Sequence, residues 1–195
     1  MKRGQRLGRG FFEQPTVELA KALIGCWLVH RTDEGVAAGR VVETEAYLAT
    51  EDDASHSSAG ETARNRAMFG TPGKAYVYMI YGVHHCLNVV SAERGVGEAI
   101  LLRALEPLEG LDLMRARRGG VGDRGLCSGP GKLVQALGVT REQDGGDFTQ
   151  GPLGLWAPAK EGTLDEIAKG PRIGIRKAAS LPLRFWIAHS PWASR

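Results

Sequence analysis

The residues best suited to chemistry lie in residues 41–88, which hold two nearby glutamates, several tyrosines and several histidines. Glu43 and Glu45 are two positions apart in an expected strand over 39–47, so their side chains share one face with Cβ atoms roughly 7 Å apart. Acids in such an apolar strand are costly to bury without a partner or a task. Either both belong to a solvated face beside an arginine, or one is a general base that activates water beside a glycosidic carbon.

A β-hairpin is expected immediately afterwards. The segments AYVYMIY (75–81) and HHCLNVV (84–90) alternate as strands do and are separated by Gly82. We expect Tyr76 to fill the core. Tyr81 is placed at the tip of the hairpin, where a large aromatic side chain is exposed and commonly contacts something.

Three aromatic faces and one arginine complete the set of candidate site residues. Tyr47, at the end of the glutamate strand, is expected to join His56 and Tyr78 in holding a flat ligand. Arg103 lies in an apolar, buried strand over 98–105, where a guanidinium needs an anion. Glu45 is the natural partner for it.

Two glycine-rich motifs do not predict nucleotide binding. GVGDRG (120–125) has the spacing of a dinucleotide loop but follows an expected helix rather than a strand. SGPGKL (128–133) lacks the spacing of a phosphate loop, with Leu133 in place of Ser or Thr. A helix opening at Lys132 could still hold one backbone phosphate through its free N–H groups, or be a plain helix start.

No metal or other cofactor is expected. His84, His85 and Cys86 are consecutive in a strand, where neighbouring side chains point to opposite faces and cannot all converge on one ion. Serine and cysteine nucleophile signatures are also missing from the sequence.

The composition is that of one ordinary globular domain, 1–195, with a basic N-terminal arm over 1–10. No apolar run is long enough for a membrane span, and no secretory signal is recognisable. Three widely spaced cysteines indicate a reduced protein of the cytoplasm. Net charge is only +3, but arginines cluster in 1–10 and 115–124. They are consistent with a nucleic-acid partner or with solvated surface segments.

The fold class expected is α+β: a single compact domain with a mainly antiparallel curved β-sheet, flanked by helices and carrying a protruding β-hairpin. Periodicity and turn residues predict a helix over 16–24, strands over 26–32 and 39–47, a helix from Pro107 through 118, a short helix over 131–138, and strand-like runs over 172–176 and 183–188.

Several of these segments together resemble one known family. VVETEAYLATEDDASHS, RNRAMFGTPGKAYVYMIYG, LLRALEPLEG and LCSGPGKLVQALG are similar to the alkyladenine (3-methyladenine) DNA glycosylases of the mammalian type. The resemblance runs from about residue 11 to the end of the chain. We expect a bacterial member, which places it in the cytoplasm at the nucleoid; a eukaryotic member would be nuclear.

The resemblance implies flipping of a damaged purine from duplex DNA and hydrolysis of its N-glycosidic bond by water, without lyase activity. It implies a monomer whose partner is double-stranded DNA containing a damaged purine, with no membrane. The resemblance implies Glu45 as general base, Arg103 to help bind the water, Tyr47, His56 and Tyr78 around the base, Asn88 against guanine, and Tyr81 in the gap in the duplex. Arg64, Arg66 and Lys132 are further candidates for contacts with DNA phosphates.

His84 departs from the family pattern, since an aromatic residue is common beside the intercalating tyrosine. Two rival functions stay open from the sequence: a non-catalytic binder of damaged DNA, and a carboxylate hydrolase acting on free nucleosides. The presence of both Glu45 and Arg103 argues against the first. The basic segments and the tyrosine at the hairpin tip argue against the second, because a small substrate requires neither.

Overall fold

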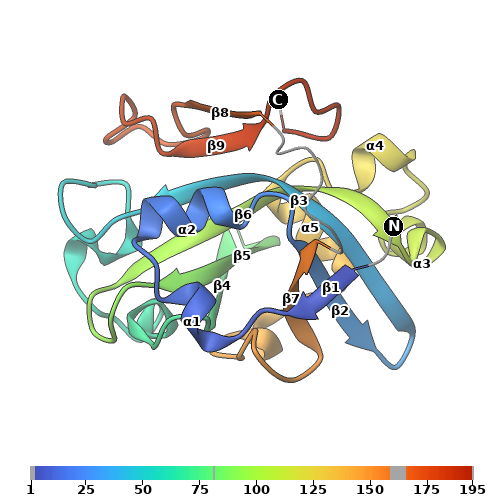
Figure 1. The fold of residues 1–195 in the computed structure, drawn as a ribbon, viewed down its shortest axis with the longest axis horizontal. Coiled ribbons are helices and arrows are strands. Elements are labelled where there is room, and N and C mark those ends of the chain that lie inside the picture. The colour runs from blue at the N-terminus through green and yellow to red at the C-terminus, as the bar shows by residue number, and fades with distance from the viewer. Residues whose placement is uncertain (1–2, 81, 159–165, 195) are drawn as a thin grey trace.

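A curved antiparallel sheet forms the body of the molecule (Figure 1). The computed structural model describes residues 3–80, 82–158 and 166–194. Along the sheet the strand order is β1-β7-β2-β3-β6-β5-β4, and β9 pairs with both β3 and β8. The strands are β1 (Arg3–Arg6), β2 (Trp27–Thr32), β3 (Gly35–Tyr47), β4 (Ala75–Ile80), β5 (His84–Ser91), β6 (Glu98–Glu109), β7 (Leu153–Pro158), β8 (Ile167–Gly170) and β9 (Arg184–Ile187).

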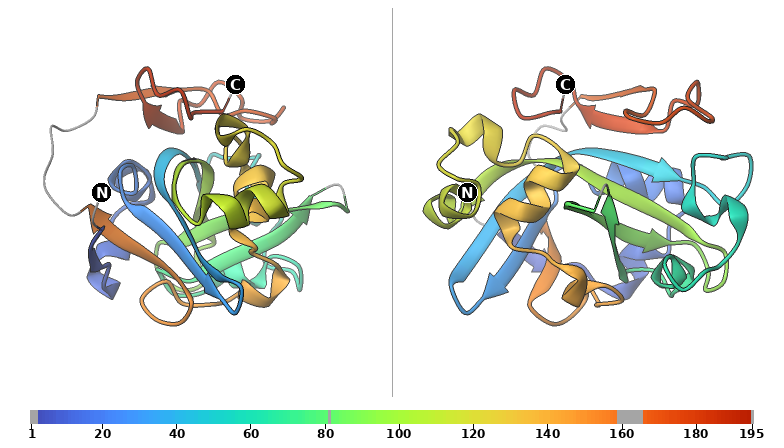
Figure 2. Two further views of the ribbon diagram at one scale, coloured as in Figure 1. Left: turned by 90° about the vertical axis from the view of Figure 1, so that its right-hand side faces the viewer. Right: turned by 180° about the vertical axis from the view of Figure 1, so that it is seen from behind.

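Helices cover the sheet on both faces, as expected for the α+β class. In Figures 1 and 2, α2 crosses one face while α5 and α3 lie on the other. The helices are α1 (Arg9–Phe12), α2 (Thr16–Ala22), α3 (Leu111–Arg117), α4 (Asp123–Leu126) and α5 (Pro130–Leu137), with short 3₁₀ helices η1 (His56–Ala59), η2 (Arg66–Phe69) and η3 (Arg141–Gln143). None of the helices in the described part of the chain is long and apolar enough to cross a membrane.

The central strands β3 and β6 are buried along most of their length because helices cover both of their faces. Their register is irregular between Val41 and Thr44, where bulges shift the pairing. A bulge bends a strand and redirects its side chains. This irregularity lies on both sides of Glu43, so the local distortion falls at the candidate site.

The expected helix start at Pro107 is wrong. Pro107 lies in β6 opposite Gly39, and α3 begins only at Leu111. Proline has no N–H to donate to the ladder, and it is tolerated there because the pairing shifts register between Ala38 and Gly39, as at a β-bulge. The turn into α3 is made by Gly110 at φ 75°, where a Cβ would lie 2.1 Å from the carbonyl oxygen of Val36.

The expected hairpin is confirmed. Tyr76 pairs with Asn88 near the start of β4, and Ile80 pairs with His84 next to the turn that joins β4 to β5. Figure 2 shows this end at the rim of the molecule, and Val83 beside it is 71% exposed. Tyr81 lies outside the described residues.

The other expected elements divide into two groups. The helices over 16–24 and 131–138 are confirmed as α2 and α5, and the strand-like run over 183–188 contains β9. The strand expected over 172–176 is wrong, since this segment is an irregular loop between β8 and β9. In this loop the backbone N–H of Ile173 donates to the side chain of Glu45 instead of pairing in the sheet.

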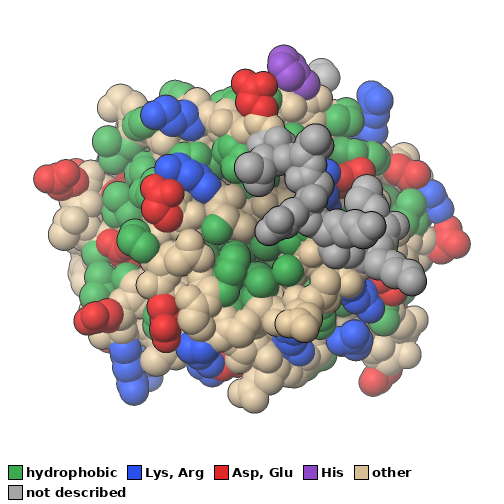
Figure 3. Space-filling model, in the orientation of Figure 1, with side chains coloured by type: hydrophobic (Ala, Val, Ile, Leu, Met, Phe, Trp, Pro, Cys, Tyr) green, Lys and Arg blue, Asp and Glu red, His purple; other side chains and the backbone are tan. Residues whose placement is uncertain are grey.

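The N-terminal arginines are occupied by contacts within the chain. Arg3 lies in β1 and bonds Glu109 at 2.8 Å, and Arg6 donates to four backbone carbonyls. Arg9 bonds the Asp147 carboxylate. On the face seen in Figure 3, acidic and basic side chains are interspersed rather than gathered by sign. The net charge alone therefore does not mark a binding surface there.

Candidate active site

Two glutamates and two arginines form a buried ionic network across three strands. Glu43 and Glu45 lie on β3, Arg103 on β6 and Arg184 on β9, and both glutamates are fully buried. Arg103 bridges them, with Nε 3.1 Å from Glu43 Oε1 and Nη1 3.2 Å from Glu45 Oε1. The shared face expected for the glutamates and the Arg103–Glu45 pairing are both confirmed. Two negative and two positive charges balance within the network.

Glu43 serves as the anchor of this network. Its Oε1 accepts hydrogen bonds from Arg103, from Nε of Arg184 at 2.6 Å and from the hydroxyl of Ser194 at 2.8 Å. Its Oε2 accepts from the backbone N–H of Ser194 at 2.6 Å. With its lone pairs taken by these donors, Glu43 has little capacity left to act on another molecule.

Glu45 has a different environment, with fewer and weaker partners. Its Oε1 accepts from the backbone N–H of Ile173 at 2.7 Å and faces Arg103, while Oε2 accepts from the Tyr47 hydroxyl at 2.9 Å. Burial raises the pKa of Glu45, and Arg103 and the two hydrogen bonds offset only part of this. A carboxylate with a raised pKa is a stronger proton acceptor than an ordinary one.

An aromatic cluster lies beside this carboxylate. The rings of His56 and Tyr78 are 4.5 Å apart at 70°, and Tyr76 and Tyr78 are 5.3 Å apart at 33°. Tyr47, Tyr76 and Tyr78 belong to one apolar cluster with Met68. Tyr47 therefore joins Glu45 to the aromatic side chains. The expectation that Tyr76 is a core residue is confirmed, since it is 1% exposed.

His56 is held in place from two directions. Its Nδ1 lies 2.8 Å from the Tyr76 hydroxyl, and its carbonyl accepts from the Asn65 side chain at 2.8 Å. Burial, with a smaller contribution from Arg64, lowers the pKa of His56, which is therefore neutral at neutral pH. A neutral ring can stack on a cationic ligand without charge repulsion.

Asn88 is buried on β5 opposite Tyr76, and its side-chain amide donates to the Tyr76 carbonyl at 2.9 Å. This bond fixes the side chain. The structure therefore brings Asn88, His56 and Tyr78 together around Tyr76, as well as Glu45 with Arg103 and Tyr47.

Sequence reasoning missed the pair Arg172 and Asp52. Two hydrogen bonds of 2.6 Å join them, and both side chains are fully buried. Arg172 lies over the Tyr47 ring, and Ile173 next to it contacts Glu45. A single arginine in a loop gives no sequence signal of such a contact. The available signal is the acidic run at 51–53, because a carboxylate that becomes buried requires a cationic partner.

Two of the three candidate phosphate-binding residues, Arg64 and Lys132, lie near the end of the β4–β5 hairpin. Arg64 donates to the Met79 carbonyl at 2.9 Å, and the side chain of Arg66 is 76% exposed although it lies 3.5 Å from a Glu61 oxygen. Lys132 is in the first turn of α5, which packs on β5. A cavity of about 460 Å³ opens between β5 and α5, and its lining includes His84, His85 and Gly131.

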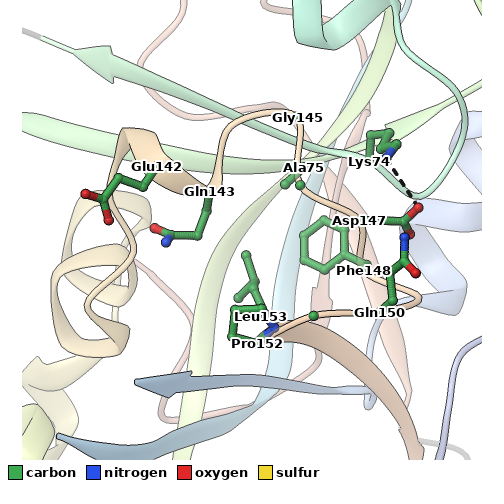
Figure 4. A pocket seen from close by; sticks show the side chains of 12 residues that line it. Lys74, Ala75, Glu142, Gln143, Gly145, Asp147, Phe148, Gln150, Pro152 and Leu153 are labelled. Atoms are coloured by element: carbon green, nitrogen blue, oxygen red, sulfur yellow. Dashed lines mark ion pairs between the residues drawn. The ribbon is translucent and has the colours of Figure 1, made fainter. Parts of the chain in front are cut away.

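A second cavity, of about 540 Å³, lies on the face of β4 opposite the aromatic cluster (Figure 4). Its lining includes Ala75 and Phe148, together with the Lys74–Asp147 ion pair. Ala75 and Tyr76 are neighbours in a strand and face opposite sides. This cavity is therefore separated by the sheet from the aromatic cluster and from Glu45.

Among the described residues, no group of three or more His, Cys, Asp or Glu side chains is arranged to hold a metal ion. Cys86 is buried, and burial raises the pKa of its thiol. The donor atoms gathered at the site are instead those of the carboxylate network and the aromatic cluster.

An α+β domain with a buried basic carboxylate joined to an aromatic cluster has the parts of a hydrolase that binds a flat group. The comparison with known proteins is more specific: residues 10–191 match the methylpurine-DNA glycosylase family. The chain belongs to this family, and it is a DNA glycosylase, an enzyme of DNA repair.

Similar proteins span nearly the whole chain. A protein of Methanoculleus marisnigri, assigned by name to the 3-methyladenine DNA glycosylases, is 53% identical over 191 residues, which cover 97% of this chain and 98% of that protein. One from Chlorobaculum parvum is 47% identical, covering 97% and 91%. The DNA-3-methyladenine glycosylase of Mus musculus is 48% identical over 206 residues, covering 97% of this chain and 61% of that protein.

Proposed function

We propose that this chain is a monofunctional 3-methyladenine DNA glycosylase that flips an alkylated or deaminated purine out of duplex DNA and hydrolyses its N-glycosidic bond. The observation that carries the proposal is the Glu45 carboxylate. It is fully buried, has a raised pKa, and is joined through Tyr47 to a cluster of aromatic rings. A base and a stacking pocket are the two parts that this reaction needs.

Glu45 is the general base in this mechanism. As the bond between C1′ of deoxyribose and the purine nitrogen breaks, its electron pair leaves with the base and a water oxygen bonds to C1′. Glu45 accepts the proton that the water loses, and its negative charge favours the oxocarbenium-like transition state. Arg103, 3.2 Å away, helps to bind the water and favours the ionised form of the carboxylate, which offsets part of the effect of burial.

Tyr47, His56 and Tyr78 form the walls that stack on the flipped purine. Alkylated purines are cationic, and the faces of aromatic rings attract cations. Such a base is also a good leaving group, because it departs as a neutral molecule. The proposed role of Asn88, whose side chain is fixed by its bond to the Tyr76 carbonyl, is to meet the exocyclic amine of guanine and exclude that base.

The hairpin and the basic residues near it are proposed to bind the duplex. Tyr81 fills the space that the flipped base leaves. Arg64, Arg66 and Lys132 bind phosphates on either side of the hairpin end, and the protein acts as a monomer. A Tyr81→Ser variant that flips bases as well as the unsubstituted protein would remove the intercalating role.

Strand cleavage is not expected, because the nucleophile in this mechanism is water rather than a lysine amine. Lys74, which directly precedes β4 in the sequence, forms an ion pair with Asp147 at 3.3 Å and lines the cavity opposite the aromatic cluster. The product of the reaction is therefore an abasic site in an intact strand.

The test is to incubate the protein with a duplex carrying one alkylated or deaminated purine and then cleave abasic sites with alkali. We expect product with the unsubstituted protein, and a loss of about 100-fold or more in Glu45→Gln. Equal product from the two proteins would overturn the proposal. Faster release of base from the free nucleoside than from the duplex would favour a nucleoside hydrolase instead.

A further inference from the structure

A buried arginine covers one face of Tyr47, a tyrosine of the aromatic cluster. The guanidinium carbon of Arg172 lies 4.5 Å from the centre of the Tyr47 ring. The side chain is fully buried and donates to the Ala46 carbonyl at 2.9 Å. The proposed mechanism gives Arg172 no task, although burying a guanidinium is costly.

Asp52 fixes this arginine in place. Its two carboxylate oxygens each accept a hydrogen bond of 2.6 Å from Arg172. They also accept hydrogen bonds from the backbone N–H groups of Leu48 and Ala54. Burial alone would raise the pKa of Asp52, but these hydrogen bonds lower it overall. Asp52 is therefore ionised at neutral pH, and the guanidinium cannot leave the ring without breaking a buried pair.

This arrangement changes what Tyr47 offers to a ligand. A tyrosine ring has two faces, and a cation on one of them draws the π electrons toward itself. A purine that stacks on Tyr47 must use the other face, which is then poorer in electrons. A cationic purine loses part of its attraction there, whereas a neutral purine keeps its dispersion and stacking energy.

We propose that Arg172 is a specificity-determining residue that acts through Tyr47: it reduces the preference of the pocket for cationic over neutral purines. This rests on the proposed function, since it assumes that Tyr47 stacks on the flipped base. It supplies a reason why one pocket would accept both alkylated and deaminated purines.

Two variants test the proposal, and each shifts selectivity in a different direction. The double variant Arg172→Met with Asp52→Asn removes both charges of the buried pair together, so that neither is left alone. The single variant Asp52→Asn keeps the cation over Tyr47 and removes the carboxylate that balances it. Both are compared with the unsubstituted protein in single-turnover release of 3-methyladenine, which is cationic in DNA, and of hypoxanthine, which is neutral.

We expect the ratio of the 3-methyladenine rate to the hypoxanthine rate to rise about threefold or more in the double variant, and to fall in Asp52→Asn. A purely structural role, for example through the Ile173 N–H on Glu45, would slow both reactions alike and leave the ratio unchanged. If one variant does not fold, as judged by circular dichroism, the other still gives a ratio with a stated direction.

An unchanged ratio in the variants that fold, or a change in the opposite direction, would overturn the inference while the proposed function stands. If the unsubstituted protein releases neither base from duplex DNA, the proposed function fails, and the inference fails with it.

Discussion

At the scale of single residues, the two glutamates on β3 differ in what surrounds them. Glu43 accepts from Arg103, Arg184 and both donors of Ser194, whereas Glu45 has one arginine, one backbone N–H and one tyrosine hydroxyl. Spacing in the sequence could not separate them, because both lie on one face of one strand. Their difference is set by partners on other strands and loops.

The first prediction concerns pH. Because burial raises the pKa of Glu45, the carboxylate is protonated, and inactive as a base, at pH values where an exposed glutamate would already be ionised. We expect the single-turnover rate of base release to rise with pH through this raised pKa and then level off. A rate that does not rise with pH above the ordinary glutamate pKa, or that falls there, would contradict the assignment of Glu45 as the base.

The second prediction is that the two glutamates have opposite effects on stability. The folded-state pKa of Glu45 is raised, so its ionisation costs stability above that pKa and costs none below the unfolded value of about 4.3. Glu45→Gln should therefore raise the melting temperature at pH 8 and change it little at pH 4. Glu43→Gln should lower the melting temperature at pH 8. The free energy of unfolding should fall by about 3 kcal/mol, because Arg184 loses its carboxylate partner.

Calorimetry of both variants at the two pH values measures this. The variants change the same atoms two residues apart, so each is the control for the other. A lower melting temperature for both at pH 8 would mean that Glu45 is a structural anchor like Glu43.

At the scale of elements, the connection from β6 to α3 depends on a close approach of two backbones. Gly110 has φ 75°, and a Cβ there would lie 2.1 Å from the Val36 carbonyl oxygen. Gly119 has a similar φ of 67° with open space around it. This gives a matched pair of glycines that differ in crowding and share a backbone conformation.

The third prediction is that Gly110→Ala destabilises the protein far more than Gly119→Ala. The left-handed conformation alone costs about 1 kcal/mol for alanine, and at Gly110 the steric overlap adds to it. We expect the melting temperature of Gly119→Ala to fall by roughly 2–4 °C and that of Gly110→Ala to fall by several times as much. Equal shifts, measured by thermal unfolding, would show that the backbones at Gly110 and Val36 can move apart at little cost in free energy.

The elements also show where sequence reasoning succeeds and where it stops. The β4–β5 hairpin and helices α2 and α5 were predictable because alternation, helical spacing and turn residues are local signals. Pro107 was misassigned because proline favours a helix start locally, while its place in β6 is set by pairing with Gly39. The loop over 172–176 looked like a strand because its apolar residues alternate.

At the scale of the whole molecule, the basic side chains of the N-terminal segment are committed to contacts within the protein. Arg3, Arg6 and Arg9 make internal contacts, whereas Arg64 and Lys132 lie near the hairpin end and the Arg66 side chain is 76% exposed. The sequence indicated basic clusters but could not show which were already paired. DNA binding is therefore expected to depend on a few side chains rather than on the net charge.

The fourth prediction is a salt dependence that these residues determine. The logarithm of the binding constant for undamaged duplex should fall with the logarithm of salt concentration, and each lost phosphate contact should reduce the slope by about 0.9. Arg66→Ala and Lys132→Ala should each show this reduction in a fluorescence titration. Arg3→Ala, whose guanidinium bonds Glu109 within the chain, is the control and should leave the slope unchanged.

The bond between Ser194 and Glu43 has a consequence for how the protein is made. These two residues are 151 positions apart, and the backbone N–H of Ser194 supplies one of the donors that hold Glu43. During translation the amino-terminal strands leave the ribosome first, while the segment around Ser194 is still inside the exit tunnel. The charge network cannot close until that segment emerges. A nascent chain that already carries Glu45 and the aromatic cluster therefore still lacks one of the donors that hold Glu43, and the network closes only when the segment around Ser194 has left the tunnel.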